Sequence, residues 1–153
     1  MFDPGSILHG YFDLGDNGKK YKFSIVLYAD AEACIITTFT TSQPRSSVLN
    51  PDHGKNPKEG DPMSYVFKAG IEIGTDPNTG FPFSFKKDTS VVPDYGIYNS
   101  TIEAFNNSVS NLTVVCKLHD KEYQSLIYTL YRCKSTKKKY KEIFEEILNN
   151  IIE

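Results

Sequence analysis

Two kinds of side chain in this sequence could bind an anion: lysines at the start of one predicted strand and hydroxyls at the end of the next. Lys20 and Lys22 enter a strand predicted over 20–29, and Thr41 and Ser42 stand where another strand opens into a long loop. Ammonium groups pair with phosphate, and hydroxyls hydrogen-bond to phosphate or to a ribose 2′-hydroxyl. High β-propensity also accounts for threonine here, so both interpretations of Thr41 and Ser42 remain open.

A second lysine pair, Lys86 and Lys87, precedes a later predicted strand. Each group of lysines taken alone is typical of a solvated surface. If the sheet curls, the lysines at 19–22, those at 86–87 and the hydroxyls at 41–42 would meet at one rim. The pattern then predicts an anion site with hydrogen-bonding groups beside it.

The three histidines, His9, His53 and His119, are far apart in the sequence. His53 follows Asp52 in the long loop, where it could act as a general acid or base, but a solvated loop histidine is the favoured interpretation. A metal site requires several ligands at compatible spacing, and the sequence supplies no such set. Phosphate-binding glycine loops and hydrolase motifs are also missing, so we expect no metal and no cofactor.

Apolar patterning predicts the strands that would position these groups. Residues 23–28 are apolar on both faces, and 34–41 are rich in β-branched residues. Pro82 restricts its segment to an edge or a bulge, and the three phenylalanines around it are assigned to the core rather than to a stacking surface. The predicted elements are strands at 5–14, 20–29, 34–41, 65–68 with an extension to 73, 81–85, 89–92 and 112–116, turns at 15–18 and 74–80, and a long loop at 42–62.

Helical patterns follow in the C-terminal third. Ile102, Phe105 and Val109 could form one short stripe. Longer amphipathic stripes follow Asp120 and Thr136, which are predicted to cap two helices.

The chain has 153 residues, 39% of them apolar and 24% charged, which is typical of a globular domain. We therefore predict one domain over 1–153, with a sheet or barrel at about 5–116 and a helical pair at about 120–152. The predicted fold class is α+β, mainly β: a small, strongly curved antiparallel sheet or barrel with C-terminal helices.

The net charge of −2 excludes nucleic-acid binding over the whole surface, so any such binding requires a local basic patch. The run at 132–141 is basic, but a solvated helical face is its favoured interpretation. Three isolated cysteines without a CxxC pair indicate reduced thiols and a cytoplasmic protein. The N-terminal residues do not resemble a signal peptide, and we expect no membrane-spanning segment.

Five short segments occur in an order that points to a known family. Gly5-Ser6-Ile7 comes first, Asp16-Asn17-Gly18 makes a turn, Lys22-Phe23 precedes an aliphatic run, Phe39 to Gln43 ends the next strand, and 85–92 reads Phe-Lys-Lys-Asp-Thr-Ser-Val-Val. Over about residues 5–95 this order resembles the MazF/PemK-like endoribonuclease toxins, also called Kid or CcdB-type barrels. The resemblance implies an SH3-like barrel in a toxin–antitoxin system, with a homodimer and an antitoxin-like protein as expected partners.

The resemblance also assigns roles by position. Lys22 stands where the family places its catalytic arginine, Thr41 where it places its catalytic hydroxyl, and Asp94 near an acidic residue of some members. That family cleaves single-stranded RNA without metal: the neighbouring 2′-hydroxyl attacks, a base and an acid move the protons, and a cation stabilises the pentavalent phosphate. The candidate substrate contacts are Lys20, Ser42, Gln43, His53, Lys86 and Lys87.

The chain departs from the family in several places. The family's Arg-Pro pair is absent, and lysine does not reproduce the planar guanidinium fork. The loop at 42–62 is long, and the second C-terminal helix is additional. A barrel that kept the fold and lost cleavage, acting as a protein- or nucleic-acid-binding module, fits these features equally well.

A binding module would use its sheet face or its helical pair. Exposure of the helical stripe residues Tyr123, Tyr131, Tyr140 and Ile151 would favour a dimer seam or a groove for an antitoxin-like peptide. A small-molecule pocket lined by the rings at 81–85 is a third interpretation.

Overall fold

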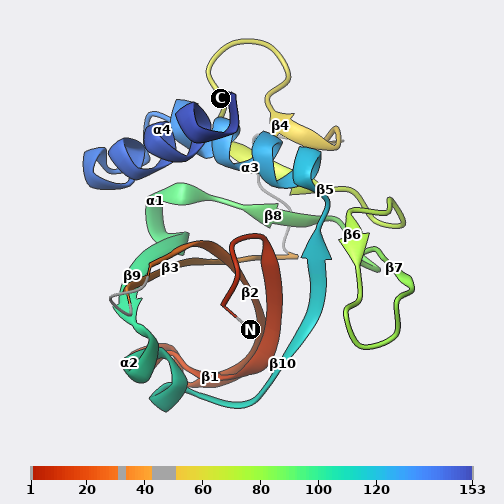
Figure 1. Cartoon of the computed structure of the whole chain (residues 1–153), viewed down its shortest axis with the longest axis vertical. Helices are drawn as coiled ribbons and strands as arrows, with labels where there is room; N and C mark the ends of the chain where they lie inside the picture. Colours follow the sequence, from red (N-terminus) through yellow and green to blue (C-terminus); the bar gives the residue numbers. More distant parts are fainter. Residues whose placement is uncertain (1, 31–33, 43–50, 153) are drawn as a thin grey trace.

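The computed structural model describes residues 2–30, 34–42 and 51–152, and these form two antiparallel sheets with several helices (Figure 1). The α+β, mainly β, class predicted from the sequence is confirmed. The strands are β1 (Ser6–Asp13), β2 (Lys19–Ala29), β3 (Cys34–Phe39), β4 (Gly54–Asn56), β5 (Ser64–Phe67), β6 (Gly74–Thr75), β7 (Pro82–Phe83), β8 (Thr89–Val91), β9 (Ile97–Thr101) and β10 (Val109–Leu118). The helical elements are the 3-10 turn η1 (Gly15–Asn17), α1 (Pro93–Gly96), α2 (Ile102–Asn107), α3 (Asp120–Arg132) and α4 (Lys138–Ile152).

The larger sheet has the strand order β7-β6-β10-β1-β2-β3-β9 and the smaller one β4-β5-β8. From β10 to β9 the larger sheet curls strongly (Figure 1), and Phe2 packs inside the curl against Phe105, at a ring-centroid distance of 5.6 Å. A hydrogen-bonded bridge between Thr41 and Ser90 connects the end of β3 to the smaller sheet. The curl therefore gives the sheet an inner and an outer face, and the side chains of one strand point alternately to each.

One hydrophobic core lies inside the curl and a second lies outside it, and we call them the inner core and the outer core. Consecutive residues alternate between the two: Ile25 belongs to the outer core and Val26 to the inner. This alternation explains why β2 is apolar on both faces, as the sequence predicts. The inner core contains Leu8, Phe12, Val26, Ile35 and Phe105. The outer core contains, among others, Ile7, Ile25, Tyr65, Phe67, Leu126, Leu130 and Phe144, from the larger sheet, the smaller sheet, α3 and α4.

The predicted barrel is not closed. β7 and β9 form the two ends of the strand order and do not pair with each other. β6 and β7 have only two residues each, too few to extend a ladder around the curl, and β9 is followed at once by α2. Phe105 of α2 fills the inside of the curl beside Phe12, at a ring-centroid distance of 5.7 Å. A helix, rather than a further strand pair, occupies the opening.

Other local expectations also need correction. Residues 69–73 form no strand, and β6 falls in the segment predicted as a turn. Asp120 is the first residue of α3 rather than its cap, since His119 holds that position. Thr136 does not cap α4 with its side chain: its hydroxyl donates to the Leu130 carbonyl at 2.6 Å, at the end of α3.

The helical stripes contact the rest of the chain rather than solvent. Tyr140 is buried, and Tyr123 donates its hydroxyl hydrogen to the Leu27 carbonyl at 2.7 Å. Tyr131 is half-buried, and of the four stripe residues singled out above only Ile151 is exposed. This burial removes most of the surface that a dimer seam on the helices would need.

The rings at 81–85 do not share one environment. Phe85 is buried and Phe83 is half-buried, whereas Phe81 is 70% exposed. The assignment of all three rings to the core is therefore wrong for Phe81. The edge position predicted for Pro82 is confirmed, because β7 ends the strand order of the larger sheet.

Candidate functional site

The inside of the curl opens into a groove of about 840 Å³. Its walls come from the end of β1, η1, the start of β2, the end of β3, α1, β9 and α2. Phe12 and Phe105 of the inner core line the groove, so it is continuous with the interior of the curl. Segments that are about 90 residues apart in the sequence thus share one cavity.

One wall of the groove is aromatic. Phe12 contacts Phe39 at a ring-centroid distance of 5.0 Å, and Phe39 stacks on Tyr98 at 5.2 Å with 28° between the planes. Phe105 completes the row beside Phe12. Such a wall can bury an apolar or planar part of a ligand.

A second wall is polar and carries two predicted site residues from one face of a single strand. Lys20 and Lys22 both line the groove, because residues two apart in β2 point to the same face. Thr41 lines it from the end of β3, where its backbone exchanges hydrogen bonds of 2.9 and 2.8 Å with Ser90. The structure therefore brings together Lys20, Lys22 and Thr41, as the sequence predicts.

The edge of β9 forms a further wall that sequence analysis missed. Tyr98, Asn99 and Ser100 are consecutive, yet all three line the groove. Since neighbouring side chains of a strand point to opposite faces, the strand edge itself must lie along the cavity. The signal for β9 is weak in the sequence because its residues, Ile-Tyr-Asn-Ser-Thr, are mostly polar.

Tyr98 lines the groove and is half-buried. Burial raises the pKa of its phenol, and the nearby hydroxyls of Thr37 and Ser24 partly offset that effect. Ser24 Oγ and Thr37 Oγ1 are themselves fully buried and form no hydrogen bond of ordinary geometry with the described residues. The phenol thus stays protonated at neutral pH and can donate a hydrogen bond.

The remaining predicted site residues do not line the described groove. Ser42, Lys86 and Lys87 are exposed and lie outside its walls. Gln43 lies outside the described residues. Asp94 belongs to α1, between the groove residues Val92 and Gly96, but its side chain is outside the described part of the chain.

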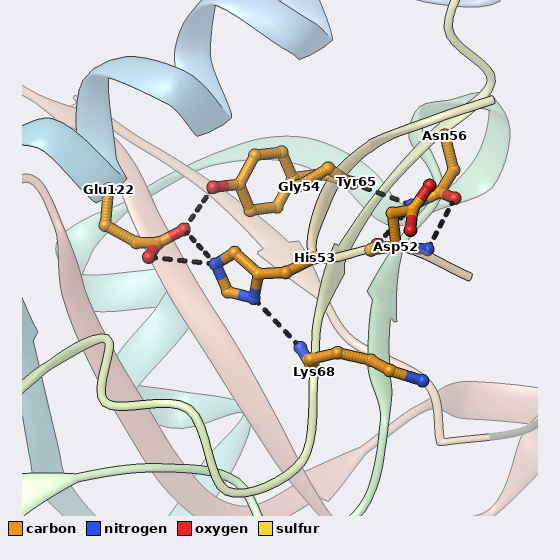
Figure 2. A network of polar contacts seen from close by, with 7 residues as sticks. All are labelled: Asp52, His53, Gly54, Asn56, Tyr65, Lys68 and Glu122. Atoms are coloured by element: carbon orange, nitrogen blue, oxygen red, sulfur yellow. Dashed lines mark hydrogen bonds and ion pairs between the residues drawn. The ribbon is translucent and has the colours of Figure 1, made fainter. Parts of the chain in front are cut away.

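His53 lies in a separate network with α3 (Figure 2). Its Nε2 is 3.0 Å from both carboxylate oxygens of Glu122, and Tyr65 donates its hydroxyl hydrogen to the same carboxylate. The backbone N–H of Lys68 donates to Nδ1 of His53 at 3.1 Å, so Nε2 carries the proton in the neutral ring. Both ring nitrogens are engaged within the chain, and neither is directed at the groove.

The network fixes the segment before β4 against β5 and α3. Asn56 donates hydrogen bonds from its amide to the carbonyls of Asp52 and Gly54, at 2.7 and 3.0 Å (Figure 2). Burial and the Glu122 carboxylate raise the pKa of Tyr65 far above its usual range. These contacts are those of a structural clamp rather than of an exposed acid or base.

Within the described residues, no three histidine, cysteine or carboxylate side chains gather as ligands for a metal ion. Cys34, Cys116 and Cys133 are not joined by disulfide bonds. None of the helices in the described part of the chain has the length and apolar character needed to cross a membrane. The chain matches no known family model, no curated protein and no solved structure.

Proposed function

We propose that the protein binds single-stranded RNA in the groove. The observation that carries this proposal is that Lys20, Lys22 and Thr41 line the same groove as a row of aromatic rings. Lysines attract the phosphate backbone, and aromatic side chains accept unpaired bases by stacking. The two features occur together in one cavity. Single-stranded RNA has a part complementary to each, because charged phosphates and planar bases alternate along its chain.

Each part of the groove has a role in this complex. Lys20 and Lys22 contact successive phosphates from one face of β2. Thr41 and Ser100 supply hydroxyls, and Asn99 supplies an amide, for the sugar 2′-hydroxyl and the edges of the bases. Tyr98 donates from its protonated phenol. Affinity comes from a local patch, because the net charge of the chain is −2.

The proposal includes a relationship in architecture to the small SH3-like barrels of the MazF/PemK kind. The strong curl from β10 to β9 supports it (Figure 1). The unpaired edges of β7 and β9 depart from it, and the groove that receives the RNA runs along the β9 edge.

Cleavage of the bound RNA is a second candidate function, favoured by one observation. Lys22 and Thr41 share the groove, and α1, which contains Asp94, begins and ends at groove-lining segments. In the reaction the 2′-hydroxyl gives its proton to a water molecule, its oxygen bonds to phosphorus, and the bond from phosphorus to the 5′-oxygen breaks, which leaves a 2′,3′-cyclic phosphate. Lys22 would stabilise the added negative charge, and the leaving 5′-oxygen would take a proton from water to become a hydroxyl.

One assay tests both candidates: a labelled, unstructured single-stranded RNA is incubated with the protein in EDTA, and binding and chain length are read in parallel. We expect Lys20→Ala and Lys22→Ala each to weaken binding about tenfold, since a charge-assisted hydrogen bond contributes on the order of 1.5–3 kcal/mol. Lys58→Ala is the matched control, because Lys58 is exposed and outside the groove.

The outcomes separate the candidates. Binding without shortening of the RNA supports the binding module alone, and shortening that Lys22→Ala abolishes supports cleavage. Equal affinity of wild type, Lys20→Ala and Lys22→Ala would exclude the groove as the RNA site. Circular dichroism of each variant establishes that the protein remains folded.

A further inference from the structure

The outer face of β1 and β2 carries aromatic side chains that neither core requires. His9 lies opposite Phe23, and Tyr11 lies opposite Tyr21, in the register of these two strands. The ring centroids of these two pairs are 4.8 and 4.9 Å apart, and those of His9 and Tyr21 are 5.5 Å apart. We call His9, Tyr11, Tyr21 and Phe23 the outer ring row.

The outer ring row is open to solvent at one end. Tyr21 is 57% exposed, and His9 and Tyr11 are half-buried. Phe23 packs against the outer core, but the other three rings belong to neither core. In Figure 1, α3 and α4 lie on the side of the curl away from the lower part of β1 and β2. Cross-strand aromatic pairs of this kind stabilise a sheet, and on a solvated face their rings also offer a surface on which a planar ligand can stack.

The rings are oriented for stacking. The planes of His9 and Tyr21 differ by only 11°, so their faces are nearly parallel. β1 and β2 are inner strands of the sheet, between β10 and β3, which gives the row a rigid base. Aromatic side chains held on a rigid sheet stack successive bases of a single strand with little dependence on sequence.

Lysines lie at both ends of the row. Lys19 precedes Tyr21 by two residues on the same face of β2. At the other end, Phe85 contacts Phe23 at 5.1 Å and is followed by the exposed Lys86 and Lys87. Asp13 lies opposite Lys19 in the register of β1 and β2, so the uncompensated positive charge is at the Lys86 and Lys87 end. Charge at the end of a ring row is complementary to a strand whose bases stack and whose phosphates remain in water.

We propose that the outer ring row is a second binding site for the same single-stranded RNA, in which Tyr21 stacks on an unpaired base and Lys19, Lys86 and Lys87 contact phosphates. This inference rests on the proposed function. β2 then serves both sites, with Lys20 and Lys22 on its inner face and Lys19 and Tyr21 on its outer face. It also gives Lys86 and Lys87 a role that the groove does not provide.

The test measures the affinity of the protein for a fluorescein-labelled oligouridine of about 16 nucleotides, the upper end of typical single-strand site sizes. Tyr21→Leu keeps bulk and loses the ring, whereas Tyr21→Phe keeps the ring and loses only a 3.5 Å contact with Asn111. Tyr128→Leu is the matched control, since Tyr128 is 50% exposed on α3. Lys22→Ala shows how much the groove contributes to the measured affinity.

We expect Tyr21→Leu to bind about tenfold more weakly than wild type, in keeping with the loss of one stacked base. Tyr21→Phe and Tyr128→Leu should bind like wild type. Wild-type affinity of Tyr21→Leu together with weak binding by Lys22→Ala would overturn the second site and leave the groove in place. Weak binding by Tyr21→Leu and normal binding by Lys22→Ala would retain the ring row and overturn the groove. A wild-type protein that binds no oligouridine overturns both.

Discussion

Glu122 accepts hydrogen bonds from two side chains that lie 57 and 69 residues away in the sequence, Tyr65 and His53. Tyr65 is only 1% exposed, so its hydroxyl is buried beside the carboxylate, and the Ser125 side chain is its other polar neighbour. His53 is less buried, but its other ring nitrogen is already occupied by the Lys68 N–H. The carboxylate therefore holds three segments together: the loop before β4, β5 and α3.

We expect Glu122→Leu to lower the free energy of unfolding by about 1–3 kcal/mol, the usual cost of an unsatisfied buried donor. Glu122→Gln should cost less, because the amide oxygen still accepts one hydrogen bond. Urea unfolding measures both. Glu145→Leu, at an exposed position of α4, serves as the control and should change stability by no more than about 0.5 kcal/mol. Equal stability of Glu122→Leu and wild type would show that the clamp contributes nothing.

Single residues differ in how far the sequence could place them. Lys20 and Lys22 could be predicted on one face, because alternation along a strand is local. The loop assignment of His53 gave no indication of Glu122, since that contact depends on how α3 packs against β5. The tautomer of His53 depends in turn on the backbone of Lys68, which no local pattern identifies.

At the scale of elements, strands with strong burial were predictable and polar or very short ones were not. β1, β2 and β3 follow from their apolar runs. β9 was not predicted because it is a polar edge strand. β6 was not predicted because it has only two residues and lies in a glycine-rich segment that is typical of a turn. The groove was therefore predicted with its lysines and Thr41 but without its β9 wall.

β6 joins β10 through a close approach at Gly74. A Cβ at this position would overlap the Lys117 carbonyl oxygen, which is backbone and cannot rotate away. We expect Gly74→Ala to reduce the free energy of unfolding by roughly 3 kcal/mol, the upper end of the cost of overpacking.

The control for Gly74→Ala is Gly60→Ala, and urea titration gives the free energy of unfolding of both variants. Gly60 has a φ of +83° and no neighbouring atom within 4 Å, so only its left-handed backbone opposes a side chain. That should cost about 1 kcal/mol. Similar losses in the two variants would indicate that β10 can move away from β6 without penalty.

At the scale of the whole molecule, the charge distribution predicts how RNA binding responds to salt. A chain with a net charge of −2 gains no general attraction to RNA, so the response reflects the few lysines in contact. For an RNA short enough to occupy the groove alone, with two phosphate contacts by Lys20 and Lys22, the logarithm of affinity should fall with a slope of about −1.4 against the logarithm of salt concentration. Raising salt fourfold should then weaken binding about sevenfold.

Lys20→Ala should halve this slope to about −0.7, while Lys58→Ala should leave it unchanged. Titrations at several salt concentrations provide the slopes. A slope near zero for the wild type would mean that stacking alone holds the RNA, and a slope steeper than about −3 would require phosphate contacts beyond the two in the groove. Lys19, Lys86 and Lys87 of the second site are the lysines that would supply them.

The position of β1 between β2 and β10 has a consequence for protein synthesis. β1 pairs with β2 across a short turn, but its other edge pairs with residues 109–117, as in the register of Phe12 with Val109. The ribosome makes Leu118 about 90 residues after β2 is complete, a delay of roughly 5–20 s at ordinary elongation rates. During that interval the nascent chain presents β1 as an open edge, which other chains can pair with. A message truncated before β10 would leave that edge open permanently, so the chain must reach Leu118 before its central strand is protected.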